Sequence, residues 1–321
     1  MIRYIALRLL NLIPMLLGIT IVSFIAIQLS PGDFLAEMRM NPVVSQETIE
    51  QMRKNFGLDQ PLPVQYLKWI WNAVRLDFGY SFAFQVPVMW LVSSRLLNTV
   101  LLNVVALTVA WVLAIPIGIY AARRQYSWAD NTLSFWAYVG ISTPSFFSGL
   151  FLLYWAFKTG WLPIGGMTSI EYEFLSTGGK ILDVAHHMVI PVLVLGVFSI
   201  AGLMRQMRAN LLEEIREDYV RTARSKGLSE HTVTYKHAVR NALNPMITLF
   251  GFELGGLIGG SAILENIIGW PGLGKLITDA VLQKDFYVVM ASLVIGSVTL
   301  VVGNLIADIL LAVADPRIRL E

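Results

Sequence analysis

Residues 213–241 read EEIREDYVRTARSKGLSEHTVTYKHAVRN, and this stretch decides how the rest of the chain is arranged. It is the one long charged segment in the second half of a chain that is 55% hydrophobic and only 14% charged. Soluble domains carry about 25% charged residues, so the sequence predicts an integral membrane protein. The stretch must then lie outside the bilayer, between membrane-spanning segments.

Several apolar runs are long enough to cross the hydrocarbon of a bilayer, which takes about 20 residues of helix. We therefore expect an all-α, polytopic membrane protein with six transmembrane helices, at residues 9–29, 96–120, 131–157, 187–204, 245–268 and 286–314. Prolines at Pro116, Pro144 and Pro191 fall inside these runs, and Pro144 lies in an interruption at residues 142–145. Helices broken by proline often line a pathway, because the freed backbone groups need partners in protein or water. A simple packing kink is the alternative.

The predicted spans divide the chain into three parts. Residues 1–30 hold the first span, 31–95 form an extracytoplasmic segment with helices at 46–56 and 64–74, and 96–321 form a five-helix core with a loop at 205–244. No cleavage site follows the first span, so we expect an uncleaved anchor. Lys and Arg gather on the side of the N-terminus, which predicts that both termini and the 205–244 loop are cytoplasmic.

The charged stretch itself predicts two short helices joined by a glycine corner. Tyr219, Val220 and Ala223 fall on one face of the first helix. Gly227 suits the left-handed turn that ends a helix, and Ser229 suits the cap that begins the next one. We therefore expect a compact helical corner outside the membrane.

The corner has features of a docking surface for another protein. Ala223 and Gly227 have minimal side chains, which would let a partner approach the backbone closely. Arg221, Arg224 and Lys226 could pair with acidic groups on that partner. A solvated basic loop with no partner is the alternative, because such loops are common on the inner side of membrane proteins.

The motifs in this stretch resemble a known family. Arg221-Thr222-Ala223, three residues, then Gly227-Leu228, followed by Arg240-Asn241-Ala242 and Pro245, resembles the coupling loop of the membrane subunits of ABC importers, in particular the B-type subunit of the dipeptide/oligopeptide permease branch. The general family pattern has Glu-Ala at the first two positions and Ile-x-Leu-Pro where this chain has residues 237–240, and the peptide branch departs in the same way. Further matches to the branch are residues 31–33, 76–79, 270–274 and 315–319.

The resemblance implies a function for the whole chain. It implies a membrane subunit that forms the translocation pathway for peptides or similar small solutes and is itself not an enzyme. Its expected partners are a paralogous permease subunit, two ATPase subunits that bind the ATP and magnesium, an extracytoplasmic solute-binding protein and membrane lipid, with no nucleic acid. The expected location is the bacterial inner membrane. The residues expected to meet an ATPase are Tyr219, Arg221, Thr222, Ala223, Lys226, Gly227 and Leu228.

Two carboxylates fall within predicted spans. Glu253 and Asp308 would each cost at least about 2.5 kcal/mol at the bilayer centre, so neither is expected to face lipid. They are candidates for the translocation pathway. The alternative for Glu253 is a polar partner inside the helix bundle, and for Asp308 a structural role near the inner end, where water or an arginine relieves its charge. If they carried protons or cations, the chain would instead be an ion-driven secondary transporter, although that function leaves the basic loop unexplained.

Small residues recur every four positions in the fifth predicted span, the spacing by which membrane helices pack backbone to backbone. Packing within this chain, contact with a second membrane subunit, or a closing gate would explain the spacing. The residues are Gly251, Gly255, Gly256, Gly259 and Gly260.

Other kinds of site are not indicated. Residues 269–275 match a phosphate-binding loop as far as Lys275, but Leu276 replaces the Ser or Thr that would hold magnesium, and no strand precedes the run. There are 0 cysteines, and the 4 histidines form no persuasive metal set. A membrane-embedded hydrolase is disfavoured because no catalytic constellation has a recognisable spacing.

Overall fold

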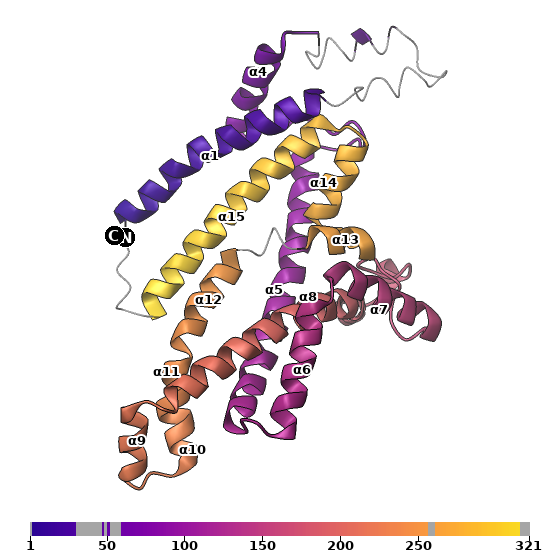
Figure 1. Ribbon diagram of the computed structural model, residues 1–321. Helices are drawn as coiled ribbons and strands as arrows, with labels where there is room; N and C mark the ends of the chain where they lie inside the picture. The colour runs from indigo at the N-terminus through magenta and orange to yellow at the C-terminus, as the bar shows by residue number, and fades with distance from the viewer. Residues whose placement is uncertain (1, 30–46, 48–49, 52–58, 256–260, 315–321) are drawn as a thin grey trace. The chain divides into compact units, whose positions relative to one another are not determined.

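The computed structural model describes residues 2–29, 47, 50–51, 59–255 and 261–314. These residues are almost entirely helical and contain no β-strand, only an isolated bridge between Tyr80 and Pro87, so the expected all-α class is confirmed. The chain divides into two compact units, Met1–Asn98 with Gly272–Val301, and Thr99–Pro271 with Val302–Glu321. Figure 1 shows the helices and their labels.

The first unit is held together by an aromatic cluster. Phe24 packs edge-on against Tyr66 and Phe286, with ring centroids 5.3 and 5.5 Å apart, and Trp69 lies 6.5 Å from Phe286. Each such pair contributes about 0.5–1.5 kcal/mol beyond the burial of apolar area. The cluster joins α1 (Ile2–Leu29), α4 (Leu62–Val74) and the start of α15 (Phe286–Ala314), and the unit also contains α14 (Leu273–Leu282) and the start of α5 (Val88–Arg123).

Asp285 fastens the loop before α5 to the beginning of α15. Its fully buried carboxylate accepts hydrogen bonds from Ser81 Oγ at 2.6 Å and from the backbone N–H groups of Ala83 at 3.0 Å and Val288 at 3.3 Å. A buried carboxylate is tolerable only when donors surround it. Asp285 is therefore a structural clamp, and the sequence analysis did not find it.

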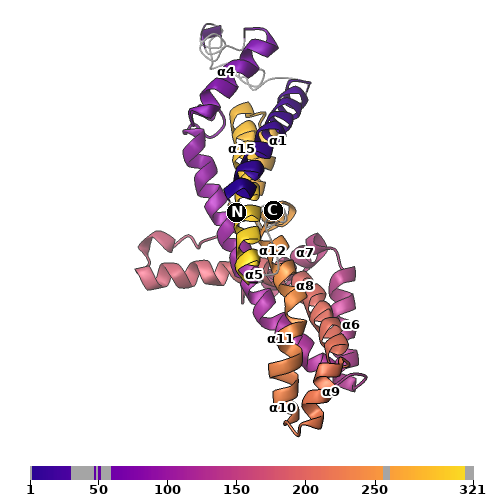
Figure 2. The same ribbon diagram turned by 90° about the vertical axis from the view of Figure 1, so that its left-hand side faces the viewer.

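The second unit contains a helical bundle and the charged corner. Its elements are the rest of α5, α6 (Trp128–Ser142), α7 (Ser145–Thr159), a 3₁₀ turn at Tyr172–Phe174, α8 (Thr177–Glu214), α9 (Asp218–Ser225), α10 (Glu230–Thr232), a π-helical turn at Val233–Ala238, α11 (Val239–Ala242), α12 (Asn244–Gly255), α13 (Ala262–Ile268) and the rest of α15. Figure 2 shows the same helices turned by 90°, with α9 and α10 side by side as in Figure 1.

Close packing of α5 against α8 occurs at Gly118. A Cβ atom on this residue would lie 2.7 Å from the backbone oxygen of Met204 and 2.8 Å from Cβ of Met207. Only glycine leaves room for two helix backbones at that separation. The sequence predicts such packing along the fifth predicted span, and Gly118 is a further site, on the second span.

The described residues contain four helices long and apolar enough to cross a membrane. They lie at Leu10–Leu29, Val88–Arg123, Thr177–Val197 and Phe286–Ile309. The pair α6 and α7 makes a possible fifth, bent by 101° at the predicted interruption before Ser145. The fifth predicted run, residues 245–268, is divided between α12 and α13, and residues 256–260 between them lie outside the described residues. The number of six spans stays a prediction.

One predicted boundary was wrong. The fourth span was expected to begin at residue 187, after an outside loop at 158–185, but α8 begins at Thr177, where Ser176 Oγ accepts a hydrogen bond from the N–H of Gly179. The charged and polar residues in the first turns of α8 masked its apolar pattern.

Two helices were expected in the extracytoplasmic segment. Of the helix at 46–56, only residues 47, 50 and 51 are described, and they are helical. The helix at 64–74 is confirmed as α4.

We predict that Asp285→Ala lowers the free energy of unfolding by about 1–3 kcal/mol, because Ser81 Oγ and the Ala83 N–H would be left without their acceptor. Thermal unfolding of the purified protein in detergent measures this. Asp279→Ala is the matched control, since its carboxylate makes a half-exposed pair with Lys275 at 3.2 Å and such pairs contribute about 0–1 kcal/mol. Equal destabilisation by both changes would contradict the clamp.

Candidate functional site

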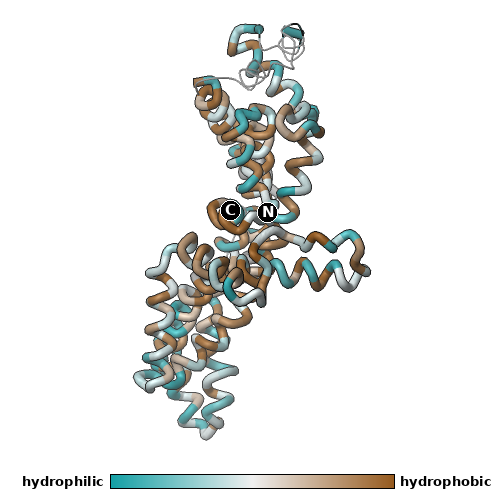
Figure 3. Tube along the Cα trace, turned by 90° about the vertical axis from the view of Figure 1, so that its right-hand side faces the viewer, coloured by the Kyte–Doolittle hydropathy of each residue, from teal (hydrophilic) through white to brown (hydrophobic). Residues whose placement is uncertain are grey.

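The charged corner has the local structure that the sequence predicts. Helix α9 ends at Ser225, Gly227 takes a φ of +79° and Ser229 caps α10 by accepting a hydrogen bond from the Thr232 N–H at 3.3 Å. The left-handed φ is the reason for glycine, because other residues are strained there by about 1–2 kcal/mol. In Figure 3 hydrophilic residues gather at this tip of the second unit.

An ion pair closes the corner. Arg224 on α9 donates from Nε to Glu230 Oε1 on α10 at 2.8 Å, so the two helices are joined on either side of Gly227. Both side chains are partly exposed, and a pair of this kind contributes less than about 1 kcal/mol. The pair therefore orients the two helices, while burial of apolar side chains holds them in place.

The inner face of α9 packs into the core of its own unit. Val220 is fully buried and Ala223 is 6% exposed, and both belong to an apolar cluster that includes Val233 and Ala238 of the π-helical turn. The expectation that the Ala223 side chain admits a partner was wrong, because it faces the interior. Its small size instead allows α9 to lie close to the π-helical turn.

Tyr219 was expected to share this face, but its side chain is partly exposed. Its hydroxyl donates a hydrogen bond to the Glu214 carboxylate near the end of α8. Burial raises the pKa of the Tyr219 phenol, and the hydrogen bond to Glu214 raises it further. The hydroxyl therefore stays protonated at neutral pH and acts as a donor that joins α9 to α8.

The remaining predicted contact residues face outward. Arg221, Thr222, Lys226, Gly227 and Leu228 are all exposed. A Cβ atom on Gly227 would meet no atom within 4 Å, so the space beside this backbone is open. The outer surface of the corner thus combines two cations, an exposed leucine and bare backbone.

A buried ion pair stabilises the helix from which the corner projects. Arg208 of α8 binds Asp130 of α6 with both ends of its guanidinium group, Nε to Oδ1 and Nη2 to Oδ2 at 2.7 Å each. The Tyr126 N–H donates to the same carboxylate at 2.9 Å. At the other side of α8, Asn210 Nδ2 donates to the backbone oxygen of Ala242 at 3.2 Å. These contacts attach α8 to α6 and α11.

The structure gives Glu253 a partner inside the bundle. Trp111 Nε1 donates to Glu253 Oε2 at 2.7 Å, and the Trp111 ring packs edge-on against Phe250. The side chain of Glu253 is half-buried on α12, and that of Asp308 is half-buried on α15. The alternative of a polar partner therefore applies to Glu253, while the pathway role of both carboxylates stays a prediction.

A third carboxylate, Glu265, was missed as a candidate. It is fully buried on α13 and its Oε1 accepts from Thr99 Oγ1 at 2.7 Å and Ser261 Oγ at 2.8 Å. Asn103 Nδ2 donates to the same serine hydroxyl at 3.0 Å. The signal was present in the sequence as two pairs of polar residues with a spacing of four, one on α5 and one on α13. This network joins the two helices.

The predicted glycine stripe of the fifth span is only partly described, and the run at 269–275 is part of the core. Gly251 is buried within α12 and Gly255 is its last residue, whereas Gly256, Gly259 and Gly260 lie outside the described residues. In the run that imitates a phosphate loop, Trp270 is fully buried against Leu102 and Met188. Within the described part of the chain, no group of three His, Cys, Asp or Glu could hold a metal ion.

A chain with several apolar helices and a polar helical corner is a polytopic membrane protein with a prominent polar loop. This chain belongs to the family of the binding-protein-dependent transport system inner membrane component, whose model matches residues 114–320. The N-terminal model of the same membrane component matches residues 1–103. The chain is therefore a multi-pass membrane subunit of an ABC importer, a class that works with ATPase and solute-binding partners.

Two relatives match over nearly the whole length. The oligopeptide transport system permease protein AppB of Bacillus subtilis (strain 168) is 45% identical over 321 residues, 99% of this chain and 100% of that protein. The glutathione transport system permease protein GsiC of Escherichia coli (strain K12) is 36% identical over 320 residues, 99% of both chains. The expected family and the expected peptide-permease branch are confirmed.

We predict that Asp130→Asn lowers the free energy of unfolding by about 3 kcal/mol. This is the low end of the cost of breaking a buried pair, because the Arg208 side chain remains 23% exposed to water. Chemical or thermal unfolding in detergent measures it. Glu173→Gln serves as the control, since that carboxylate is 81% exposed and bonded to Lys180 at 3.4 Å. A neutral Asp130→Asn would show that the pair does not stabilise the bundle.

Proposed function

We propose that this chain lines the pathway of an ATP-driven importer for peptides and that the corner at Gly227 receives the force from an ATPase subunit. The names of the two relatives, which refer to oligopeptide and glutathione transport, support a peptide solute. A paralogous membrane subunit, two ATPase subunits and an extracytoplasmic binding protein complete the proposed assembly. ATP and magnesium bind to the ATPase subunits, and this chain contributes no catalytic residue.

The observation that carries the docking role is the construction of the corner. Its inner residues, Val220 and Ala223, are packed into the bundle, and its outer residues are open to a partner. A partner that binds this corner and moves would therefore move the helical bundle of the second unit with it. In the proposed orientation both termini and the corner are cytoplasmic, which places the corner where ATP is available.

The proposed contact surface follows from the exposed set. Arg221 and Lys226 offer charge for acidic groups on the ATPase subunit, and Leu228 offers an apolar contact. Gly227 lets the partner backbone approach closely, because nothing in this chain fills the space beside it. Ala223 and Tyr219 would act by holding α9 in place from inside and from the end of α8.

We predict that Gly227→Val abolishes uptake by the complete complex reconstituted in liposomes, because a branched side chain would occupy the open space where the partner docks. Uptake of a labelled peptide and substrate-stimulated ATP hydrolysis are the measurements. The matched control is Gly160→Val. Gly160 has a φ of +68° and open space beside it, like Gly227, but it caps α7 outside the corner.

The two variants experience the same kind of backbone strain, so a general loss of stability would affect both. Normal uptake with Gly227→Val, or equal loss with Gly160→Val, would contradict docking at the corner. Binding of peptide by the isolated solute-binding protein is expected to be unchanged throughout, because that protein does not contain the substitution.

An ion-driven transporter would depend on an ionisable group at Glu253. We predict that Glu253→Gln keeps uptake within about twofold of wild type, because the amide oxygen can still accept from Trp111 Nε1. Uptake is expected to continue in the presence of a proton uncoupler and to stop when ATP is removed. Loss of uptake with both Glu253→Gln and the uncoupler would favour the ion-driven function over the proposed one.

A further inference from the structure

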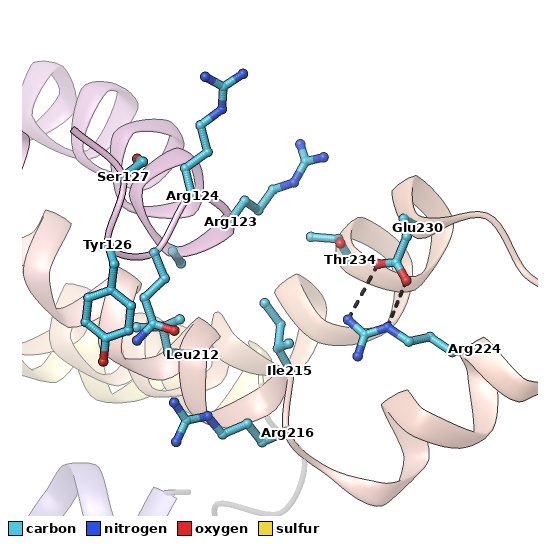
Figure 4. A pocket seen from close by; sticks show the side chains of 12 residues that line it. Arg123, Arg124, Tyr126, Ser127, Leu212, Ile215, Arg216, Arg224, Glu230 and Thr234 are labelled. Carbon is cyan, nitrogen blue, oxygen red and sulfur yellow. Dashed lines mark hydrogen bonds and ion pairs between the residues drawn. The ribbon is translucent and has the colours of Figure 1, made fainter. Parts of the chain in front are cut away.

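A cavity of about 740 Å³ lies in the second unit, between the α5–α6 turn and the corner. We call it the basic pocket. Figure 4 shows the side chains around it. Its lining residues come from the end of α5, the turn after it, the end of α8, α9, α10 and the π-helical turn: Ala122, Arg123, Arg124, Gln125, Tyr126, Ser127, Leu212, Ile215, Arg216, Arg224, Glu230 and Thr234.

The basic pocket has an excess of positive charge. Four arginines line it against one glutamate, and that glutamate is bonded to Arg224. In the described part of the chain, Arg123, Arg124 and Arg216 take part in no ion pair with a carboxylate. An anionic ligand would satisfy them, since arginine presents several N–H donors suited to phosphate.

The pocket also offers an apolar surface. Figure 4 shows Arg123 and Arg124 on one side of Leu212 and Ile215 and Arg216 on the other. The pocket, about 740 Å³ and open to solvent, is larger than a single small ion needs. A ligand that combines an anionic group with a larger, partly apolar body would fit it.

The position of the pocket identifies which ligand of this kind is close by. Arg123 is the last residue of the candidate span Val88–Arg123. Beside it, Tyr126 is 79% exposed and Trp128 is 82% exposed. Exposed tyrosine and tryptophan at the end of a span are typical of the headgroup level of a bilayer. Arg123 donates to the Tyr235 hydroxyl at 3.3 Å and Arg124 stacks on Tyr120, but neither has a carboxylate partner. These arginines therefore lie where phospholipid headgroups lie.

We propose that the basic pocket binds the headgroup of an anionic phospholipid from the adjoining leaflet. The phosphate meets Arg123 and Arg124, and the glycerol region rests on Leu212 and Ile215. Arg216, on the other side of these two residues, adds positive charge to the pocket. A lipid bound there joins the α5–α6 turn to the base of the corner. This inference goes beyond the proposed transport function and does not depend on it, because lipid binding is measured without transport.

The experiment uses the complete complex in nanodiscs of phosphatidylcholine with an equal amount of phosphatidylglycerol. After gentle extraction into detergent, native mass spectrometry counts the phosphatidylglycerol retained per complex. Each arginine near an anionic membrane contributes about fivefold in affinity, equivalent to about 1 kcal/mol. The double variant R123Q/R124Q is expected to weaken retention about 25-fold, and Arg216→Gln about fivefold.

The matched control is Arg205→Gln on α8. Arg205 is exposed and stacks on Tyr138 at 4.6 Å, outside the basic pocket, so its replacement removes the same charge without changing the site. Retention is expected to be unchanged. Glu230→Gln adds a gain-of-function variant. It releases Arg224 from its ion pair and is expected to increase retention about two- to fivefold.

Three outcomes would overturn the proposal. Equal retention by wild type and R123Q/R124Q, in protein with an unchanged melting temperature, would exclude the site. Displacement of phosphatidylglycerol by millimolar inorganic phosphate would show that a soluble anion is the ligand. Loss of the ATPase subunits from R123Q/R124Q, with phosphatidylglycerol retained, would show that the pocket binds an acidic protein segment instead.

Discussion

The ion pair between Arg208 and Asp130 is the interaction on which the second unit depends. It forms where a charged carboxylate has almost no access to water, and two parallel hydrogen bonds of 2.7 Å offset the cost of its desolvation. With α8 attached to α6 at this point, the helix continues as far as Glu214 and the corner begins within a few residues. The geometry of the corner therefore follows from a contact between spans.

The same logic explains the other buried carboxylates. Asp285 collects three donors from the loop before α5 and the start of α15, and Glu265 collects two hydroxyl groups from α5 and α13. Each acid is placed where two segments distant in sequence must meet. In an environment with few water molecules, such an acid discriminates strongly between correct and incorrect helix pairing, since a misplaced partner leaves the carboxylate without donors.

The sequence was most informative where local rules decide the structure. Gly227 and Ser229 predicted the corner because a positive φ and a helix cap are properties of a few neighbouring residues. Residues 142–145 predicted the break between α6 and α7 for the same reason. The start of α8 at Thr177 was missed, since its polar first turns resemble a loop when hydropathy is the only criterion.

Contacts between distant segments were less accessible to sequence analysis. Nothing near Ala223 shows that its side chain faces Val233 and Ala238, so a small residue on a charged helix was interpreted as an outer contact. The hydrogen-bond partner of Glu253 could not be predicted from the sequence either, because Trp111 lies far from it along the chain. Gly118 differs from other glycines only through Met204 and Met207, which approach it from another helix.

Helix α8 has one further consequence. Its 38 residues form a single element that would extend about 57 Å at a rise of about 1.5 Å per residue, longer than the bilayer core of about 30 Å. Because one helix reaches from the corner into the apolar part of the chain, a displacement at Glu214 is carried toward the membrane without an intervening loop. Pro191 is the one residue within α8 that has no backbone N–H and so removes a helical hydrogen bond. Any bending of the helix is expected to concentrate there.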